Sequence, residues 1–145
     1  MKSKLIHHND ERTFALVFDT GDEPMVSLSI LANQLHLAGS HFTGIGAFSD
    51  VVLGYFDWKR KRYEPIPITE QVEVLSLVGD ITVVDGKSKV HAHVVVGKAD
   101  GSAHGGHLLE AHVRPTLEVV LVESPVHLRR TPNAESGLPV IDLEA

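Results

Sequence analysis

The chain has 145 residues, of which 43% are hydrophobic and 22% charged, a composition typical of one globular domain. It contains no cysteine, which excludes disulfides and thiolate metal sites. The formal net charge of −6 argues against direct nucleic-acid binding, because such binding depends on lysine and arginine side chains that neutralise phosphates.

The first third of the chain predicts one strand and one helix. Residues 13–19 are rich in β-forming side chains and predict a short strand. A turn over residues 20–24 leads into a helix over residues 26–38, in which leucines recur at helical spacing. Gly39 supplies the C-terminal stop of this helix.

The rest of the chain predicts mostly strands. They are expected over residues 41–48, 50–58, 62–68, 71–84, 90–96 and 116–123. Two prolines confine 62–68 to a sheet edge, and Asp85-Gly86 predicts a tight hairpin turn. One helix against a mainly antiparallel β-sheet is an α+β fold with two layers. We therefore predict a single domain over residues 1–145, with a core over about 12–123 and a loosely ordered tail over 124–145.

Two of the predicted strands are apolar on both faces, over residues 94–96 and 119–122. A strand of this kind needs cover on both sides, and one helix covers only one face of the sheet. The economical solution is a homo-oligomer, in which a second copy of the chain supplies the missing cover.

Three histidines form the clearest chemical pattern. His91 and His93 are two residues apart on a predicted strand, so their side chains point the same way. The turn-rich residues 98–102 allow the chain to fold back, and His107 then follows two glycines. Three imidazoles without cysteine or an obvious carboxylate suit zinc or a similar divalent ion, with one coordination position open. The alternative is that the histidines are ordinary polar side chains on a solvated face.

One basic run, Lys59 to Arg62, interrupts the acidic character of the chain. It is either a hairpin tip that contacts phosphate or a solvated turn whose charges protect a strand edge. The net charge favours the solvated turn.

Four segments carry a family resemblance when they are taken in order. They are residues 12–17, residues 39–47, residues 73–79, and residues 91–93 with 105–108. Together they resemble the plants-and-prokaryotes-conserved (PPC) domain family, in its stand-alone prokaryotic form. The resemblance implies a mainly antiparallel α/β domain that forms a homotrimer, with His91, His93 and His107 near a subunit interface, where they hold a zinc-type ion in some members.

The chain departs from the plant members of this family, which join the domain to AT-hook segments that contact DNA. It lacks the Arg-Gly-Arg-Pro core of an AT-hook, and the nearest segment, residues 129–132, has no glycine. A reader of the DNA minor groove needs arginine or lysine in an extended arm.

Three functions therefore remain open. The first is a trimeric module that binds a small molecule or a protein partner. The second is a zinc-dependent hydrolase or lyase that uses a metal-bound water, with Glu73 or Glu110 as general acid or base. The third is a DNA-associated regulator. Glu73 is expected to be half-buried and Glu110 to lie on the strand face opposite His107, although both residues are also explained as ordinary solvated glutamates.

No apolar run approaches the length that is needed to span a bilayer. The first eight residues also lack the apolar core of a signal peptide. We expect a cytoplasmic protein with no membrane partner.

Overall fold

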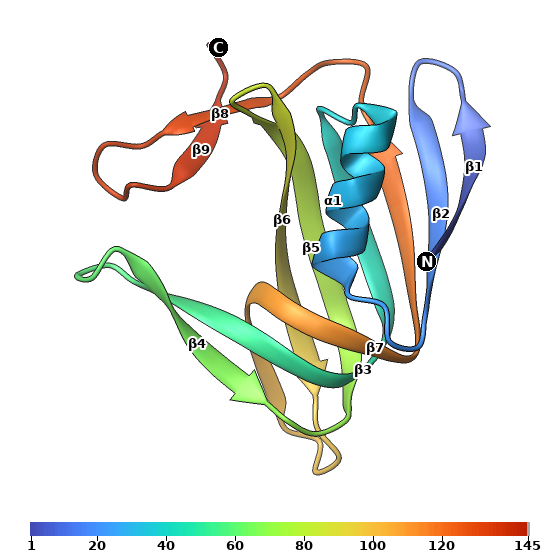
Figure 1. The fold of residues 1–145 in the computed structure, drawn as a ribbon, viewed down its shortest axis with the longest axis vertical. Coiled ribbons are helices and arrows are strands. Elements are labelled where there is room, and N and C mark those ends of the chain that lie inside the picture. Colours follow the sequence, from blue (N-terminus) through green and yellow to red (C-terminus); the bar gives the residue numbers. More distant parts are fainter. Residues whose placement is uncertain (145) are drawn as a thin grey trace.

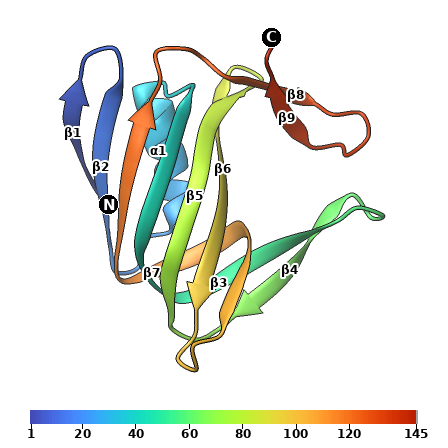
Figure 2. The ribbon, with the colours of Figure 1, turned by 180° about the vertical axis from the view of Figure 1, so that it is seen from behind.

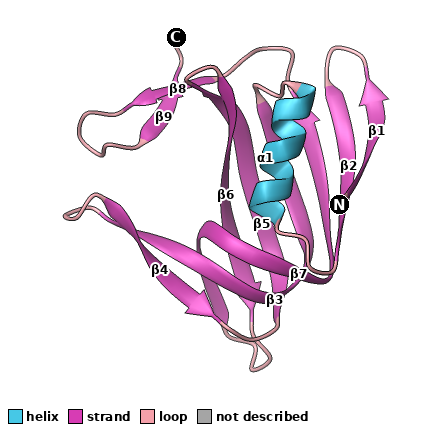
Figure 3. Ribbon diagram, in the orientation of Figure 1, coloured by secondary structure: helices cyan, strands magenta, loops and turns pink. Residues whose placement is uncertain are grey.

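The structure, a computed structural model that describes residues 1–144, is a large, mainly antiparallel sheet with one helix packed on it (Figures 1 and 3). The helix α1 spans Pro24–Leu35. Among the described residues there are nine strands: β1 (Lys2–His8), β2 (Arg12–Asp19), β3 (Ser40–Asp57), β4 (Arg62–Ile68), β5 (Val72–Val84), β6 (Lys87–Gly97), β7 (Ala103–Glu123), β8 (Arg129–Pro132) and β9 (Pro139–Asp142). This architecture confirms the predicted α+β fold. None of residues 1–144 belongs to a helix that is long and apolar enough to cross a membrane.

The strand order is β1-β2-β7-β3-β5-β8-β9, with β4 paired to β3 and β6 paired to both β5 and β7. Strand β7 is long and bends, so that residues 103–107 pair with β6 and residues 116–123 pair with β2. Because β3 also pairs with β5 and β7, the strands β7, β3, β5 and β6 close into a ring. The hairpins β3–β4 and β8–β9 project to one side of this ring, as Figure 1 shows.

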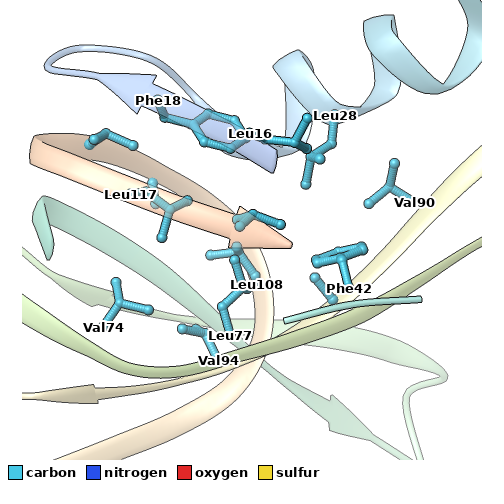
Figure 4. Close-up of a cluster of buried hydrophobic side chains, with 14 of the residues drawn as sticks. Leu16, Phe18, Leu28, Phe42, Val74, Leu77, Val90, Val94, Leu108 and Leu117 are labelled. Carbon is cyan, nitrogen blue, oxygen red and sulfur yellow. The ribbon is translucent and has the colours of Figure 1, made fainter. Parts of the chain in front are cut away.

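Helix α1 covers one face of the sheet, and Figure 2 shows the strands from the other side. The core between helix and sheet includes Leu28 of α1 and the fully buried Phe18, Phe42 and Leu117 of three different strands (Figure 4). Each such side chain stabilises the fold by about 1.5–3 kcal/mol through removal of its surface from water.

The helix begins one residue after Glu23, whose carboxylate accepts hydrogen bonds from the backbone N–H groups of Met25 and Val26. This cap satisfies two of the N–H groups that have no partner inside a helix. Pro24 fits the first turn because its fixed φ is already helical.

The helix ends at Leu35, three residues earlier than the sequence predicts. His36 takes the left-handed conformation with φ of 52° and closes the helix. Gly39 has another role, since a Cβ atom there would lie 2.3 Å from the carbonyl oxygen of Val126. The glycine is required for a close approach between two backbone segments.

Three further expectations about strands are wrong. The two strands expected over 41–48 and 50–58 are one strand, β3, with register shifts that mark bulges. The last strand begins at Ala103 rather than at residue 116, so it includes His107. The tail over 124–145 is not loosely ordered where it forms the β8–β9 hairpin.

Glu123 is a buried charged residue that ties the end of β7 to the start of β3. Its carboxylate accepts hydrogen bonds from the backbone N–H groups of Ala38 (2.9 Å) and Gly39 (3.4 Å) and from the hydroxyl of Ser40. Arg12 lies 3.9 Å from the same carboxylate. The backbone N–H groups of Ala38 and Gly39 and the hydroxyl of Ser40 therefore all have the Glu123 carboxylate as their hydrogen-bond acceptor.

We expect Glu123→Gln to lower the free energy of unfolding by about 1–2 kcal/mol, because one oxygen that accepts hydrogen bonds becomes an amide donor facing other donors. Urea denaturation measures this difference, and Glu11→Gln, at an exposed position between β1 and β2, is the matched control. Equal stability of the two variants would show that the Glu123 contacts contribute nothing net.

Candidate metal centre

The three predicted histidines converge because of their positions on one hairpin. His91 and His93 lie on the same face of β6, and His93 stands directly opposite His107 in the β6–β7 pair. Directly opposed residues on antiparallel strands bring their Cβ atoms to within about 4.5–5.5 Å. The ring centroids are accordingly 5.1–5.4 Å apart, and one nitrogen of each ring lies within 4.8 Å of the others.

The chemistry of this histidine cluster fits a metal ion. Burial, together with the nearby His91, His93 and Lys89, lowers the pKa of His107 to about 4, so this imidazole is neutral near pH 7. Its Nδ1 atom is buried and has no hydrogen-bond partner among residues 1–144. Burial also lowers the pKa of His93. A neutral imidazole with a free lone pair is the form that binds zinc.

His91 is held by two side chains that our sequence analysis missed. Asp80 lies opposite His91 in the β5–β6 pair, and its carboxylate is 3.5 Å from His91 Nδ1. Arg130 of β8 lies 2.9 Å from both carboxylate oxygens of Asp80 and 3.3 Å from the same His91 nitrogen. Burial alone would raise the pKa of Asp80, but hydrogen bonds from His91 and Arg130 outweigh it and keep this pKa low. Contacts of this kind orient the histidines that bind metals.

Tyr63 of β4 supports the third histidine. Its ring stacks on His107 with the centroids 4.4 Å apart and the planes 23° apart. This contact links the projecting β3–β4 hairpin to the histidine cluster.

The sequence did contain a signal for Asp80. Asp85 and Gly86 both have positive φ, as the expected two-residue hairpin turn requires. Such a turn fixes the register of the two strands, and counting back from it places Asp80 opposite His91. No comparable signal identifies Arg130 or Tyr63, because neither belongs to the β5–β6–β7 hairpins that carry the histidines.

A cavity of about 1030 Å³ adjoins the histidine cluster. It opens where the edge of β6 is free, since β7 pairs with β6 only from His93 onward. His91 and His107 line it, together with residues of α1, β4, β7, β8 and β9 and the segment before β9.

The structure separates the two candidate glutamates. Glu110 lines the same cavity as His107, so the expectation that it lies on the opposite face is wrong. The reason is a bulge: Leu53 pairs with Leu108 and Val52 with Glu110, which leaves Leu109 as an extra residue. Glu73 lies elsewhere, on a shallow groove beside β3, and is exposed rather than half-buried.

The basic run between β3 and β4 uses its charges within the chain. Arg60 and Arg62 both form ion pairs with Glu64. Lys61 lies 3.6 Å from the centre of the Trp58 ring and donates a hydrogen bond to the carbonyl oxygen of Glu135. These contacts favour the solvated-turn interpretation over phosphate binding.

A second histidine–carboxylate pair lies outside the histidine cluster. His112 Nδ1 is 2.8 Å from an Asp50 carboxylate oxygen. This hydrogen bond raises the pKa of His112 against the opposing effect of burial, and the charges of Asp50, Glu110 and Glu23 raise it further. The pair therefore contributes stability below the ordinary histidine pKa of about 6.5, and this contribution is lost as the pH rises through the raised pKa.

We expect Asp50→Asn to lower the pKa of His112 toward its ordinary value, as followed by NMR titration of the imidazole. Both side chains are more than one third exposed, so the loss of stability should stay below about 1 kcal/mol and should fade at alkaline pH. A pKa that does not change in the variant would mean that Asp50 does not set the protonation of His112.

Comparison with known proteins identifies relatives over most of the chain. The sequence model of the Plants and Prokaryotes Conserved (PCC) domain matches residues 6–125. Two bifunctional GlmU proteins from Synechococcus strains are 32% and 29% identical over 120 and 136 residues. These matches cover 81% and 92% of the chain, but it spans only 18% and 21% of the length of these curated relatives.

Solved structures of similar proteins cover the chain almost completely. A candidate DNA-binding protein from Bacteroides thetaiotaomicron has a TM-score of 0.88 at 26% identity, with 99% of each chain covered. A plant- and prokaryote-conserved protein from Pyrococcus horikoshii has a TM-score of 0.84 at 30% identity, covering 90% of this chain and 91% of that one. A metal-containing protein from Archaeoglobus fulgidus has a TM-score of 0.83 at 30% identity, covering 95% and 98%.

Proposed function

Because this chain belongs to the Plants and Prokaryotes Conserved domain family, we propose that it is a trimeric metal-binding module that captures a small molecule or a protein segment. His91, His93 and His107 hold zinc or a similar divalent ion. Bound there, such an ion supplies a Lewis acid with an open coordination position beside the cavity.

The observation that carries this proposal is the buried His107 Nδ1 atom that has no hydrogen-bond partner among residues 1–144. A buried polar atom without a partner costs about 1–3 kcal/mol, and a metal ion removes that cost by accepting the lone pair. The similarity to the metal-containing Archaeoglobus fulgidus protein supports the same reading.

The trimer is supported by the uncovered face of the sheet. Large apolar side chains are exposed on five positions of four adjoining strands: Ile45, Leu75, Val78, Val95 and Val120. Residues beside them along the strands, such as Val74 and Leu77, are buried, so the alternation of strand side chains turns the exposed set away from the core. Further copies of the chain cover this surface.

A second candidate function is a hydrolase or lyase, and the position of Glu110 favours it. An exposed carboxylate in the cavity that holds His91 and His107 is placed to move a proton to or from a bound molecule. This function would be established if the wild type hydrolyses or cleaves a test substrate and Glu110→Gln loses that activity while its metal content stays unchanged.

DNA association ranks third. The chain is acidic, and Arg130, in the segment closest to an AT-hook, is only 10% exposed and is bound to Asp80 and Thr82. Binding through phosphate contacts would make the affinity for duplex DNA fall steeply between 50 mM and 200 mM salt. We expect no such fall for this protein.

The decisive experiment measures metal content per subunit together with mass by light scattering. The wild type is compared with the His91→Ala/His93→Ala double variant, on protein without a histidine tag. We expect about one ion per chain in a trimer of the wild type and none in the double variant. Wild-type protein that neither contains nor takes up metal would overturn the proposal.

A further inference from the structure

The chemistry of the cavity suggests which ligand it takes, an inference that rests on the proposed metal site. We propose that the cavity binds an amphipathic monocarboxylate, with the carboxylate beside Lys89 and His107 and the apolar tail against α1 and β9. Three features carry this proposal: an uncovered apolar helix face, one cation without a partner, and a charge balance that admits a single negative charge.

Helix α1 presents apolar side chains where a surface helix normally presents charged ones. Its twelve residues, PMVSLSILANQL, include no charged residue. Val26 and Ile30, one turn apart, are 56% and 54% exposed, and both line the cavity. A surface helix ordinarily places polar residues on the face turned away from the core. The apolar face is therefore suited to an apolar part of a ligand.

The strands β7 and β9 add further apolar side chains to the wall of the cavity. Leu109, the extra residue of the β7 bulge, and Val140 of β9 are also large, partly exposed apolar residues that line it. An apolar ligand in this space contacts α1, β7 and β9 together. A concave, mostly apolar space with a few polar groups at one end is typical of small-molecule sites.

The polar end of the cavity carries one free cation. Lys89 is exposed, lines the same cavity as His107, and has no ion pair within the described chain. Arg130 also lines the cavity, but its donors are taken up by Asp80, Thr82 and the carbonyl oxygen of Pro139. Lys89 is thus the group that pairs with an anionic head.

The remaining charges select a single negative charge. The histidines are neutral ligands, so they leave the positive charge of a bound ion uncompensated, whereas the Arg130–Asp80 pair has no net charge. A bound divalent ion and Lys89 bring three positive charges, and the carboxylates of Glu23 and Glu110 bring two negative ones, so the net charge of the cavity matches a single negative charge on the ligand. A dicarboxylate would also bring its second charge against Val26 and Ile30, which cannot hydrogen-bond it.

Calorimetry with simple carboxylates tests this inference on the metal-loaded protein, whose metal content is measured in the same sample. Acetate, butyrate and hexanoate should bind progressively more tightly, by about two- to fourfold for each added CH₂ group. Adipate, a dicarboxylate of the same chain length, and neutral hexanamide should each bind at least about tenfold more weakly than hexanoate.

Two variants with matched controls assign the contacts. Lys89→Met should weaken hexanoate binding by about five- to tenfold, whereas Lys87→Met, at the exposed start of β6 outside the cavity, should not. Ile30→Ser should reduce the gain per CH₂ group, whereas Leu143→Ser, 87% exposed and outside the cavity, should leave it unchanged. All four variants should keep the wild-type metal content.

The outcomes separate this inference from the metal site on which it rests. Full metal content without saturable hexanoate binding, or hexanamide bound as tightly as hexanoate, overturns the monocarboxylate and leaves the metal site standing. Hexanoate binding that is equally tight after the metal is removed supports the cavity and Lys89 as the binding elements. It overturns the contribution of the ion's positive charge to carboxylate binding.

Discussion

We expect His107→Ala to lower the affinity of the protein for zinc by about two to three orders of magnitude. Zinc sites in small proteins bind with apparent free energies of about 10–16 kcal/mol, so each of a few ligands contributes several kcal/mol. His107 brings its imidazole to the histidine cluster from β7, where it stands opposite His93 with its ring 5.2 Å from that of His91. Competition against a chelator of known affinity measures the change.

The control for this variant is His104→Ala on the same strand. His104 is exposed, lies outside the histidine cluster and, among the described residues, forms only a long 3.5 Å side-chain hydrogen bond with Ser102, so its loss should leave zinc affinity unchanged. Circular dichroism of both variants separates loss of the site from loss of the fold. If His107→Ala folds and still binds zinc like the wild type, the three histidines do not form the site.

The second large effect is expected from Asp80→Asn, which should weaken zinc binding by about 10- to 100-fold. Asp80 contacts His91 Nδ1 and carries the ion pair with Arg130. The asparagine keeps the size of the side chain but loses the charge, so the acceptor that orients His91 becomes weaker and Arg130 loses its counter-charge. The same chelator competition gives the measurement.

Asp50→Asn is the matched control, because Asp50 is also a carboxylate bound to a histidine nitrogen, but that histidine, His112, lies outside the cluster. Its zinc affinity should equal that of the wild type. Two variants with the same small loss would mean that Asp80 acts through general electrostatics and not by orienting His91.

Much of the histidine cluster was predictable because it depends on local geometry. His91 and His93 share a face on any strand, and the Asp-Gly turn fixes the partner of each β6 residue on β5. The pairing of His93 with His107 was harder to predict, since the five-residue loop over 98–102 does not fix its register by composition alone.

The effects of a strand bulge and of contacts between distant segments could not be predicted from the sequence. A single extra residue, Leu109, reverses the face on which Glu110 lies, and strand alternation gives no warning of such an insertion. Arg130 reaches Asp80 from β8, which lies 50 residues further along the chain and touches β5 through one parallel bridge. Contacts of this kind depend on tertiary packing, because no local pattern in the tail predicts its partner.

The sequence by itself determined the α+β fold, the single helix, the hairpin around Asp85-Gly86 and the three histidines, because periodicity and turn chemistry act over a few residues. Only the tertiary structure decided that Asp80, Arg130 and Tyr63 support the histidine cluster and that Glu110 shares its cavity. It also placed Val26 and Ile30 on the wall of a cavity, where these two apolar side chains of α1 are exposed. These features arise from long-range strand pairing and bulges, whose register the side-chain pattern of one strand does not specify.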